Sequence, residues 1–247
     1  MNNLVDLHTH TVFSRHAWST LTDNIDFALS KGMKYYGFSD HQPGDKKNMG
    51  ADLPNIINVG IIPRKIGDLT ILRGIEMNVG PNLEESYTNL SRQINNLDYA
   101  IGSIHLYDCP LNLGIDAYTN YYLEAINKPM IKILGHIDDG HYLPDYDVVI
   151  REAKAKNVLI EINNSSLNEG NYRLNSKENI IEILKICKEI SAPIILNTDS
   201  HIKYSIGDVD NAFKICEELN FPHELIANIN TDIIEETIDY KNKKVRL

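Results

Sequence analysis

Short, almost uninterrupted apolar segments recur along this chain and alternate with longer amphipathic ones. Seven of the short segments have the length of β-strands: Leu4–Leu7, Tyr35–Ser39, Thr70–Ile75, Tyr99–Ile104, Ile131–Gly135, Val158–Ile162 and Pro193–Asn197. A strand that is apolar along its whole length must be covered on both faces, which is typical of parallel strands flanked by helices. More than any other feature of the sequence, this alternation limits the folds that the chain can adopt.

The longer segments between the strands have the periodicity of amphipathic helices. Helices are predicted at Thr22–Lys31, Tyr118–Asn127, Asp147–Lys156, Glu178–Ile190 and Asp208–Leu219. Thr20 or Thr22 is a candidate N-cap for the first of them, and Gly32 is a candidate left-handed C-cap. The repeated strand–helix units predict an α/β fold in which parallel strands close a barrel through right-handed crossovers. Segment 40–69, which contains three prolines, is expected to form a lid-like loop with some helix.

The composition fits one globular domain that spans residues 1–247. Hydrophobic residues make up 43% of the chain and charged residues 23%, which is enough to bury a sizeable core. The first residues lack the basic and apolar regions of a secretory signal, and no apolar run reaches the roughly 18–20 residues that span a membrane. The cysteines, Cys109, Cys187 and Cys216, form no Cys-x-x-Cys pair. We therefore expect a cytoplasmic protein with reduced, mostly buried thiols and no membrane partner.

The charge of the chain bears on its partners. Its net charge is −10, and its lysines and arginines are scattered rather than clustered. Stable binding to nucleic acid needs many phosphate contacts from a basic face, so the sequence argues against it. A small anionic substrate is still compatible with an acidic chain, because bound divalent cations reverse the local field in a cleft.

Potential metal ligands stand at the ends of six of the seven predicted strands. They are His8 and His10, His41, Glu76, His105, His136, and Asp199 with His201, in the order of the strands that they follow. The carboxyl ends of parallel strands meet at one rim of a barrel, where active sites lie, so these side chains are expected to share one cleft. The i, i+2 spacing of the first and last pairs places both members on one side of an extended segment.

The residue types at this rim are those that bind catalytic zinc or a related transition metal. Each residue alone has a simpler explanation: a single His-x-His is weak evidence, His105 or His136 fits a hydrogen-bonded core histidine, and Glu76 fits an ion pair with Arg73. Their coincidence at one rim favours a metal cluster. Two other histidines, at positions 141 and 223, are expected at the surface.

At these residues the sequence resembles the PHP (polymerase and histidinol phosphatase) superfamily, and within it the YcdX-like stand-alone phosphatases. The matching segments are Val5–Thr11, His16–Thr20, Ser39–His41, Leu72–Glu76, His105, His136, Glu161–Ser166 and Thr198–His201. The resemblance extends nearly end to end and implies a distorted (β/α)7, TIM-like barrel. The chain departs from close relatives at residues 137–140 and at Arg15, which precedes His16. Both departures bear on substrate preference.

The resemblance also implies a site for three divalent ions, most consistent with zinc and compatible with manganese or iron. One ion would be bound by His8, His10, Glu76 and Asp199, a second by Glu76, His105 and His136, and the third by His16, His41 and His201. All nine positions hold competent ligands. The sequence therefore predicts an intact catalytic site.

The expected reaction is hydrolysis of phosphomonoesters of small metabolites or nucleotides. A metal-bound hydroxide would attack phosphorus in line, Arg15 would help to hold the phosphate oxygens, and Asp199 would accept a proton as well as bind metal. Asp6 and Asp40 are candidates to orient neighbouring imidazoles, or else cap turns. The adjacent Asn163 and Asn164 would bind substrate or a ligand, or else only turn the chain after the sixth strand.

Three alternatives remain open at this point. The chain is compatible with a histidinol-phosphate phosphatase, and with a 3′→5′ exonuclease or nucleotide phosphatase, although its acidity argues against the latter. A metal-binding regulatory protein without turnover ranks last, because structural zinc sites are usually closed and rich in cysteine. The sequence does not indicate an oligomeric state.

Overall fold

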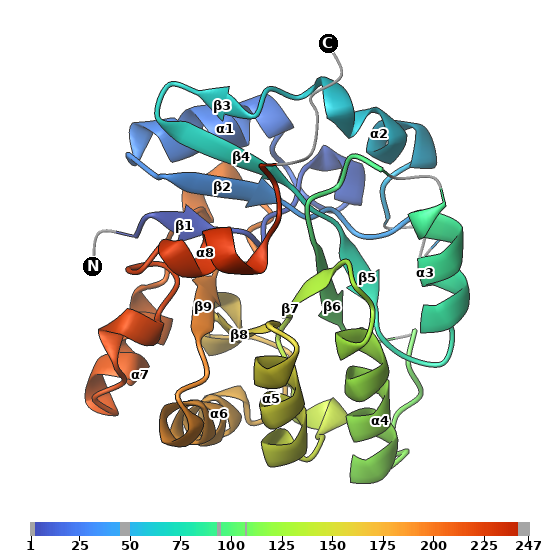
Figure 1. The fold of residues 1–247 in the computed structure, drawn as a ribbon, viewed down its shortest axis with the longest axis vertical. Helices are drawn as coiled ribbons and strands as arrows, with labels where there is room; N and C mark the ends of the chain where they lie inside the picture. Colours follow the sequence, from blue (N-terminus) through green and yellow to red (C-terminus); the bar gives the residue numbers. More distant parts are fainter. Residues whose placement is uncertain (1–2, 45–49, 93–94, 107, 242–247) are drawn as a thin grey trace.

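The computed structural model describes residues 3–44, 50–92, 95–106 and 108–241. Its strands form two sheets (Figure 1). The first sheet has the order β1 (Val5–Asp6), β2 (Tyr35–Phe38), β4 (Leu69–Arg73) and β3 (Lys65–Ile66). The second has the order β5 (Glu76–Asn78), β6 (Ala100–Ser103), β7 (Ile131–Leu134), β8 (Leu159–Asn163) and β9 (Ile194–Asn197). Neighbouring strands are parallel except β3 and β4, which are antiparallel.

Two short bridges join these sheets. Thr9, beyond β1, pairs with Ser200, beyond β9, and His41, beyond β2, pairs with Glu76 at the start of β5. The expected TIM-like α/β barrel is therefore confirmed in a distorted form, with its hydrogen bonding interrupted between the two sheets. Both bridges contain or adjoin predicted metal ligands, so the closure of the barrel and the assembly of the site depend on the same segments.

The predicted strand Thr70–Ile75 is wrong in one respect, because it bends at Gly74 and continues as β5 in the second sheet. The side chain of Tyr99 occupies the space at the bend: a Cβ atom on Gly74 would lie 2.3 Å from its ring, and one on Gly37 would lie 2.3 Å from its hydroxyl. That hydroxyl donates a hydrogen bond to the carbonyl oxygen of Leu7, at 2.5 Å. Glu76 is therefore the first residue of a new strand and does not follow a strand end.

All five predicted helices are present, with their ends shifted by a few residues. They are α1 (Leu21–Ser30), α4 (Ile115–Ile126), α5 (Tyr146–Ala155), α6 (Ser176–Ile190) and α7 (Asp210–Glu218). Thr20 is the N-cap of α1 in a capping box with Asp23, and Gly32 has a φ of 67° after the helix, as expected. In the described part of segment 40–69, the expected helix is present as α2 (Leu53–Ile57), followed by a 3-10 turn, and the short strand β3 was not expected. Residues 45–49 lie outside the description.

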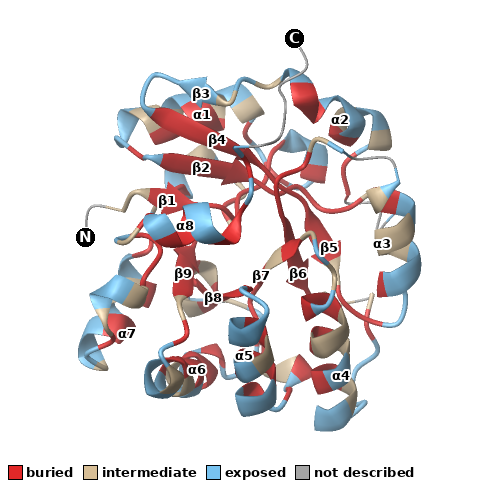
Figure 2. Cartoon of the chain, viewed as in Figure 1, coloured by how far each residue is buried: buried red, intermediate tan, exposed pale blue. Residues whose placement is uncertain are grey.

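Two further helices have no counterpart among the predictions: α3 (Leu83–Ser91) and α8 (Asp232–Thr237). Figure 2 shows that the strands are buried almost throughout, whereas the helices are buried on one side only. Among the described residues, no helix has the length and apolarity that a membrane crossing requires. The three cysteines are buried, as expected.

The buried side chains form two separate cores. The larger core lies between the strands and the surrounding helices. The smaller core fills the barrel interior with residues from alternate strand positions, among them Val5, Leu72 and Ile133. Ile233 and Ile234 of α8 complete this inner core, and α8 lies across the amino end of β2, where the Tyr35 hydroxyl donates to Glu235 at 2.7 Å. One end of the barrel is thus closed by packing, which leaves the opposite end for chemistry.

Candidate metal centre

The carboxyl ends of the strands bring together the imidazoles and carboxylates that the sequence singled out. His8, His105, His136 and Asp199 each stand two residues after the end of a strand, where the chain leaves the sheet and turns across the rim. His136 and Asp199 have positive φ angles of 30° and 52°. Such angles are strained for residues other than glycine and are concentrated at functional sites. The backbone is therefore bent to aim these side chains inward.

Glu76 lies at the centre of the cluster and is buried. Its Oε1 atom is 3.1 Å from Nε2 of His105 and 3.1 Å from Nε2 of His136. The same atom is 3.2 Å from Nε2 of His8, while Oε2 is 3.0 Å from Nδ1 of His41. One carboxylate thus faces four imidazoles from four different strand ends, which is the arrangement expected of a bridging ligand.

Asp199 faces the other side of the same group. Its Oδ1 atom is 3.1 Å from Nε2 of His10 and 3.5 Å from Nε2 of His8. Groups of three ligand atoms that lie within 4.8 Å of one another include His8, His10 and Glu76, and also His8, His136 and Asp199.

The remaining histidines form the outer part of the cluster, nearer to solvent. Nε2 of His16 and Nε2 of His201 are 2.7 Å apart. His10, His41 and His201 also present ligand atoms within 4.8 Å of one another. The structure therefore brings all nine predicted ligands into one cluster at the rim of the barrel.

Four of these imidazoles are held in the orientation that a metal ligand requires. The Nδ1 atoms of His10, His16, His105 and His201 lie 2.6–2.9 Å from fixed oxygen atoms, which are Ser14 Oγ, the Ser14 carbonyl, Asn78 Oδ1 and the Asp199 carbonyl. A carbonyl or amide oxygen can only accept, so Nδ1 carries the proton in His16, His105 and His201. Nε2 then points inward as a lone pair, ready to bind a cation.

The chemistry of these ligand atoms fits bound cations. Among the described residues, Nε2 of His8, Nε2 of His10 and Oε2 of Glu76 are buried without a hydrogen-bond partner. The facing Nε2 atoms of His16 and His201 are both lone pairs when Nδ1 is protonated, so they repel unless a proton or cation lies between them. Buried polar atoms without partners are costly, and divalent ions at these positions would satisfy them.

The electrostatics of the cluster keep its carboxylates charged. Burial raises the pKa of Glu76, but His105, His8 and His41 outweigh it and hold that pKa well below its usual value. Burial lowers the pKa of His10 well below its usual value, with His201 adding to the effect. Burial lowers the pKa of His8 too, but Glu161 and Glu76 outweigh it and raise that pKa well above its usual value. The cluster therefore offers an anionic carboxylate for metal binding, and a metal ion bound by His8 would displace a proton from its ring.

Glu161 is a functional residue that the sequence reasoning did not assign. It lies inside β8, fully buried, and its Oε1 atom accepts from His8 Nδ1 and Asn197 Nδ2, both at 2.8 Å. Its Oε2 atom accepts from the backbone N–H of His136 at 2.8 Å and from Asn163 Nδ2 at 3.0 Å. Glu161 thus fixes the proton of His8 on Nδ1 and directs its Nε2 atom to the cluster. The sequence did contain a signal for this role, because Glu161 is a carboxylate within a strand that was expected to be buried on both faces.

Arg173 is the second residue that was missed. Its guanidinium is buried, donates to Asp199 Oδ2 at 2.8 Å and to Ser166 Oγ at 3.0 Å, and lines the cavity over the cluster. Arg15, the arginine predicted to contact phosphate, instead pairs with Asp52 at 2.5 Å and is absent from the cavity wall. The role of Arg15 stays a prediction. Arg173 lies in a loop without periodicity, so no pattern distinguished it.

Asp6 and Asp40 stabilise the rim in different ways. Asp40 accepts from Ser14 Oγ at 2.6 Å, and Ser14 Oγ in turn contacts Nδ1 of His10, so Asp40 acts on a ligand through one hydroxyl. Asp6 contacts no imidazole; it accepts from Thr198 Oγ1 at 2.6 Å and from the Gly207 N–H at 2.9 Å. Burial raises the pKa of Asp6 to about 6.

The other polar candidates have structural contacts. Asn163 accepts from the N–H of Ser165, and Asn164 accepts from the N–H of Ala212, so both hold the turn after β8. Outside the cluster, His141 is partly buried and contacts Asp139, whereas His223 is exposed, as expected, and contacts Glu217.

An open cavity of about 570 Å³ lies over the cluster. Its wall includes the predicted ligands His16, His41, His105, Asp199 and His201, together with Arg173, Ser165, Asn171, Tyr172, Asn78, Asp108, Leu106 and Trp18. Trp18 is 82% exposed at the edge of this cavity. The ligands thus border a space large enough for a small molecule.

Comparison of this chain with known proteins identifies its family and its class of enzyme. The PHP domain model matches residues 6–172, so the chain belongs to the PHP family. It is 42% identical over 250 residues to a probable phosphatase of Clostridium acetobutylicum, covering 98% of this chain and 97% of the relative. It is 35% identical over 243 residues to a probable phosphatase of Caldicellulosiruptor saccharolyticus, covering 98% of both chains. The expected hydrolase activity on phosphoric esters is thereby supported.

Two solved structures share the fold. The histidinol phosphate phosphatase of Lactococcus lactis, solved with zinc, L-histidinol and phosphate, has a TM-score of 0.64 at 19% identity and covers 88% of this chain and 94% of its own. A putative histidinol phosphatase of Listeria monocytogenes also has a TM-score of 0.64, at 17% identity, and covers 84% of this chain and 99% of its own. At these identities the likeness confirms the fold.

Proposed function

We propose that the chain, as one domain, is a metal-dependent phosphomonoesterase that acts on small phosphorylated metabolites or nucleotides. The observation that carries this proposal is the convergence of buried ligand atoms without partners on Glu76, at the base of an open cavity. We further propose that it works in the cytoplasm.

The proposed metal sites follow the groups at the rim. His8, His10, Glu76 and Asp199 would bind one ion, Glu76 with His105 and His136 a second, and His16, His41 and His201 a third. Divalent ions at such positions acidify bound water and neutralise phosphate charge. Imidazole and carboxylate ligands suit zinc, and manganese or iron also.

Side chains of the protein would position the phosphate group of the substrate at the metal ions. We assign phosphate binding to Arg173, because its planar guanidinium lies in the cavity wall and is fixed by Asp199 and by Ser166. A guanidinium held in this way is aligned for two oxygens of a phosphate before the substrate arrives. Asp199 uses Oδ2 for Arg173 and presents Oδ1 to the imidazoles, and proton transfer to Asp199 stays a prediction.

The first experiment measures hydrolysis of p-nitrophenyl phosphate by the purified protein as isolated, after chelation, and after adding back zinc, manganese or iron(II). We expect activity to disappear with the metal and to return with it, and elemental analysis to find more than one ion per chain. Bound metal without turnover of any phosphomonoester would refute the proposal and favour the non-catalytic alternative. A panel that includes histidinol phosphate, nucleotides and an oligonucleotide then separates the enzymatic alternatives.

A matched pair of variants tests the ligand assignment. Glu76→Gln removes the central carboxylate, and we expect it to lose bound metal and activity together. Glu182→Gln makes the same change at an exposed position of α6 and should leave both unchanged. Full metal content in Glu76→Gln would contradict the assignment.

A further inference from the structure

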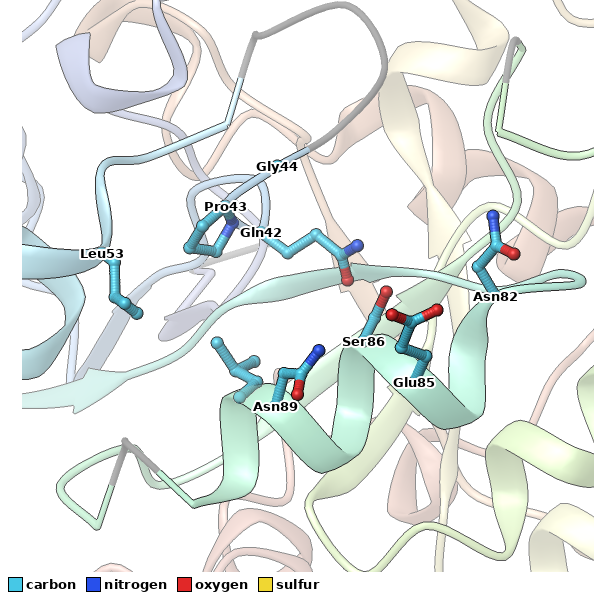
Figure 3. A pocket seen from close by; sticks show the side chains of 9 residues that line it. Gln42, Pro43, Gly44, Leu53, Asn82, Glu85, Ser86 and Asn89 are labelled. Atoms are coloured by element: carbon cyan, nitrogen blue, oxygen red, sulfur yellow. The ribbon is translucent and has the colours of Figure 1, made fainter.

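A second cavity of about 420 Å³ lies beside the metal centre, between α3 and the chain that follows β2. Figure 3 shows Gln42 pointing from that chain toward Ser86 of α3, with Glu85 and Asn89 along the same helix and Asn82 immediately before it. We call this space the α3 cavity.

The α3 cavity lies next to the cavity over the metals. A small hollow of about 60 Å³ lies between them. It shares Asn78 and Asp108 with the metal cavity, and it shares Gln42, Asn82 and Ser86 with the α3 cavity. Because each space has lining residues in common with the next, the three lie in sequence from the metal ligands to α3.

The wall of the α3 cavity is fixed to the metal centre by the backbone. Gln42 follows the ligand His41, and its N–H donates to the carbonyl oxygen of Glu76 at 2.9 Å. Its side-chain oxygen accepts from the N–H of Asn78 at 3.2 Å, and Asn78 Oδ1 accepts from Nδ1 of His105 at 2.8 Å. The segments that supply three ligands therefore also set the position of this wall, so a substrate anchored at the metals would meet it in a defined geometry.

The chemistry of the wall indicates what it binds. The described residues that line the α3 cavity and the hollow offer amides and a hydroxyl, which both donate and accept hydrogen bonds. None of those residues is a lysine, arginine or histidine, and two, Glu85 and Asp108, are acidic. Among the described residues, the acidic Glu85 and Asp108 would disfavour a second phosphate or carboxylate on the substrate, whereas neutral hydroxyl groups would find partners at the amides.

On the basis of the proposed phosphatase function, we propose that the α3 cavity binds the leaving group of the substrate, and that this group is neutral and rich in hydroxyl groups. The preferred substrate class is then a sugar or polyol monophosphate. The phosphate binds at the metal centre, and the hydroxyl groups extend past Asn78 to the amides of α3.

The test compares three probes on the metal-loaded enzyme: glucose 6-phosphate, fructose 1,6-bisphosphate and p-nitrophenyl phosphate, whose short aryl group does not extend along these cavities. We expect a higher kcat/KM for the monophosphate than for the bisphosphate. The double variant Asn82→Ala/Asn89→Ala should lower kcat/KM for glucose 6-phosphate about tenfold, the effect of losing two hydrogen bonds. Its activity on p-nitrophenyl phosphate should stay within about twofold of the parent.

The control is Asn120→Ala, which makes the same type of change at an exposed position of α4 that lines none of these cavities. A charge variant adds a gain of function: Glu85→Lys should raise the ratio of bisphosphate to monophosphate turnover several-fold, and Glu182→Lys on α6 should not.

Each outcome is decisive for this proposal. Equal losses with glucose 6-phosphate and p-nitrophenyl phosphate, no loss with either, or a preference for the bisphosphate would overturn it while leaving the phosphatase function intact. If no probe is hydrolysed, the phosphatase function itself fails. Calorimetric titration with glucose 6-phosphate then decides whether the cavity binds it: weaker binding by the double variant than by Asn120→Ala supports the cavity, and equal binding refutes it.

Discussion

Replacing Glu161 by glutamine removes one charge from a side chain that makes four hydrogen bonds inside the barrel. Both oxygens are engaged: Oε1 accepts from His8 and Asn197, and Oε2 from the N–H of His136 and from Asn163. A glutamine must place its NH2 group at one of these two positions. At the Oε2 position, the new NH2 group would face the backbone N–H of His136, which can only donate. At the Oε1 position, it would face the NH2 group of Asn197, which is held there because Asn197 Oδ1 accepts from the N–H of Leu7.

The magnitude follows from these contacts. A buried donor left without an acceptor costs about 1–3 kcal/mol, and losing the charge in contact with His8 brings the total to about 3–5 kcal/mol. For a chain of this size, about 2–4 °C of Tm is lost per kcal/mol, so we expect the metal-free Tm to fall by about 6–20 °C. Because His8 also loses its fixed tautomer, metal affinity should fall about 10–100-fold.

The assay is thermal unfolding of the metal-free protein, followed by metal titration against a competing chelator. Glu182→Gln, exposed on α6, is the matched control and should change neither quantity. A Tm within about 2 °C of the parent together with unchanged affinity would show that Glu161 neither stabilises the barrel nor orients His8.

Three other predictions follow from the same contacts. Ser14→Ala removes the hydroxyl that holds Nδ1 of His10, and metal affinity should fall about tenfold in the same titration, whereas no change would mean that the ring is fixed by packing. Arg173→Lys keeps the charge but loses the planar fork, so kcat/KM for p-nitrophenyl phosphate should fall about 100-fold at unchanged metal content, and a loss of metal instead would assign it a structural role. Hydrogen bonding to Lys241 lowers the pKa of Glu235 from 4.5 to about 2, so its contribution to stability is complete above pH 4.5 and disappears toward pH 2. Denaturation should therefore show Glu235→Gln to be less stable than the parent at pH 7 and equal to it near pH 2; a gap that is constant with pH would contradict this.

The barrel was predictable because its strands are apolar along their whole length, and most of the predicted ligands were recognisable because they stand just beyond the ends of those strands; Glu76, at the start of β5, is the exception. Helix α3 was not, since only Leu83 and Leu90 are buried in it and its remaining residues are polar. The bend at Gly74 depends on Tyr99, which lies just before β6 and far along the chain, so no local pattern encodes it.

The candidate site likewise contains residues that a local pattern predicts and residues whose roles depend on distant parts of the chain. Glu76 and the histidines are marked by their own positions in the sequence, whereas Glu161 and Arg173 acquire their roles from partners far along the chain. Arg173 meets Asp199 only after the loop beyond β8 folds back over the rim. The α3 cavity arises in the same way, between two segments that the sequence did not bring together.

The last part of the chain closes the barrel, and this has a consequence for how the protein is made. The edge of β1 is completed by Asn197, which accepts a hydrogen bond from the N–H of Leu7 across 190 residues of sequence. At about 5–20 residues per second, a ribosome would leave that edge unpaired for about 10–40 s. The inner core stays open longer still, until Ile233 and Ile234 of α8 emerge. A nascent chain stalled before α8 would expose both an open strand edge and the apolar interior of the barrel, which makes such fragments natural substrates for chaperones and proteases.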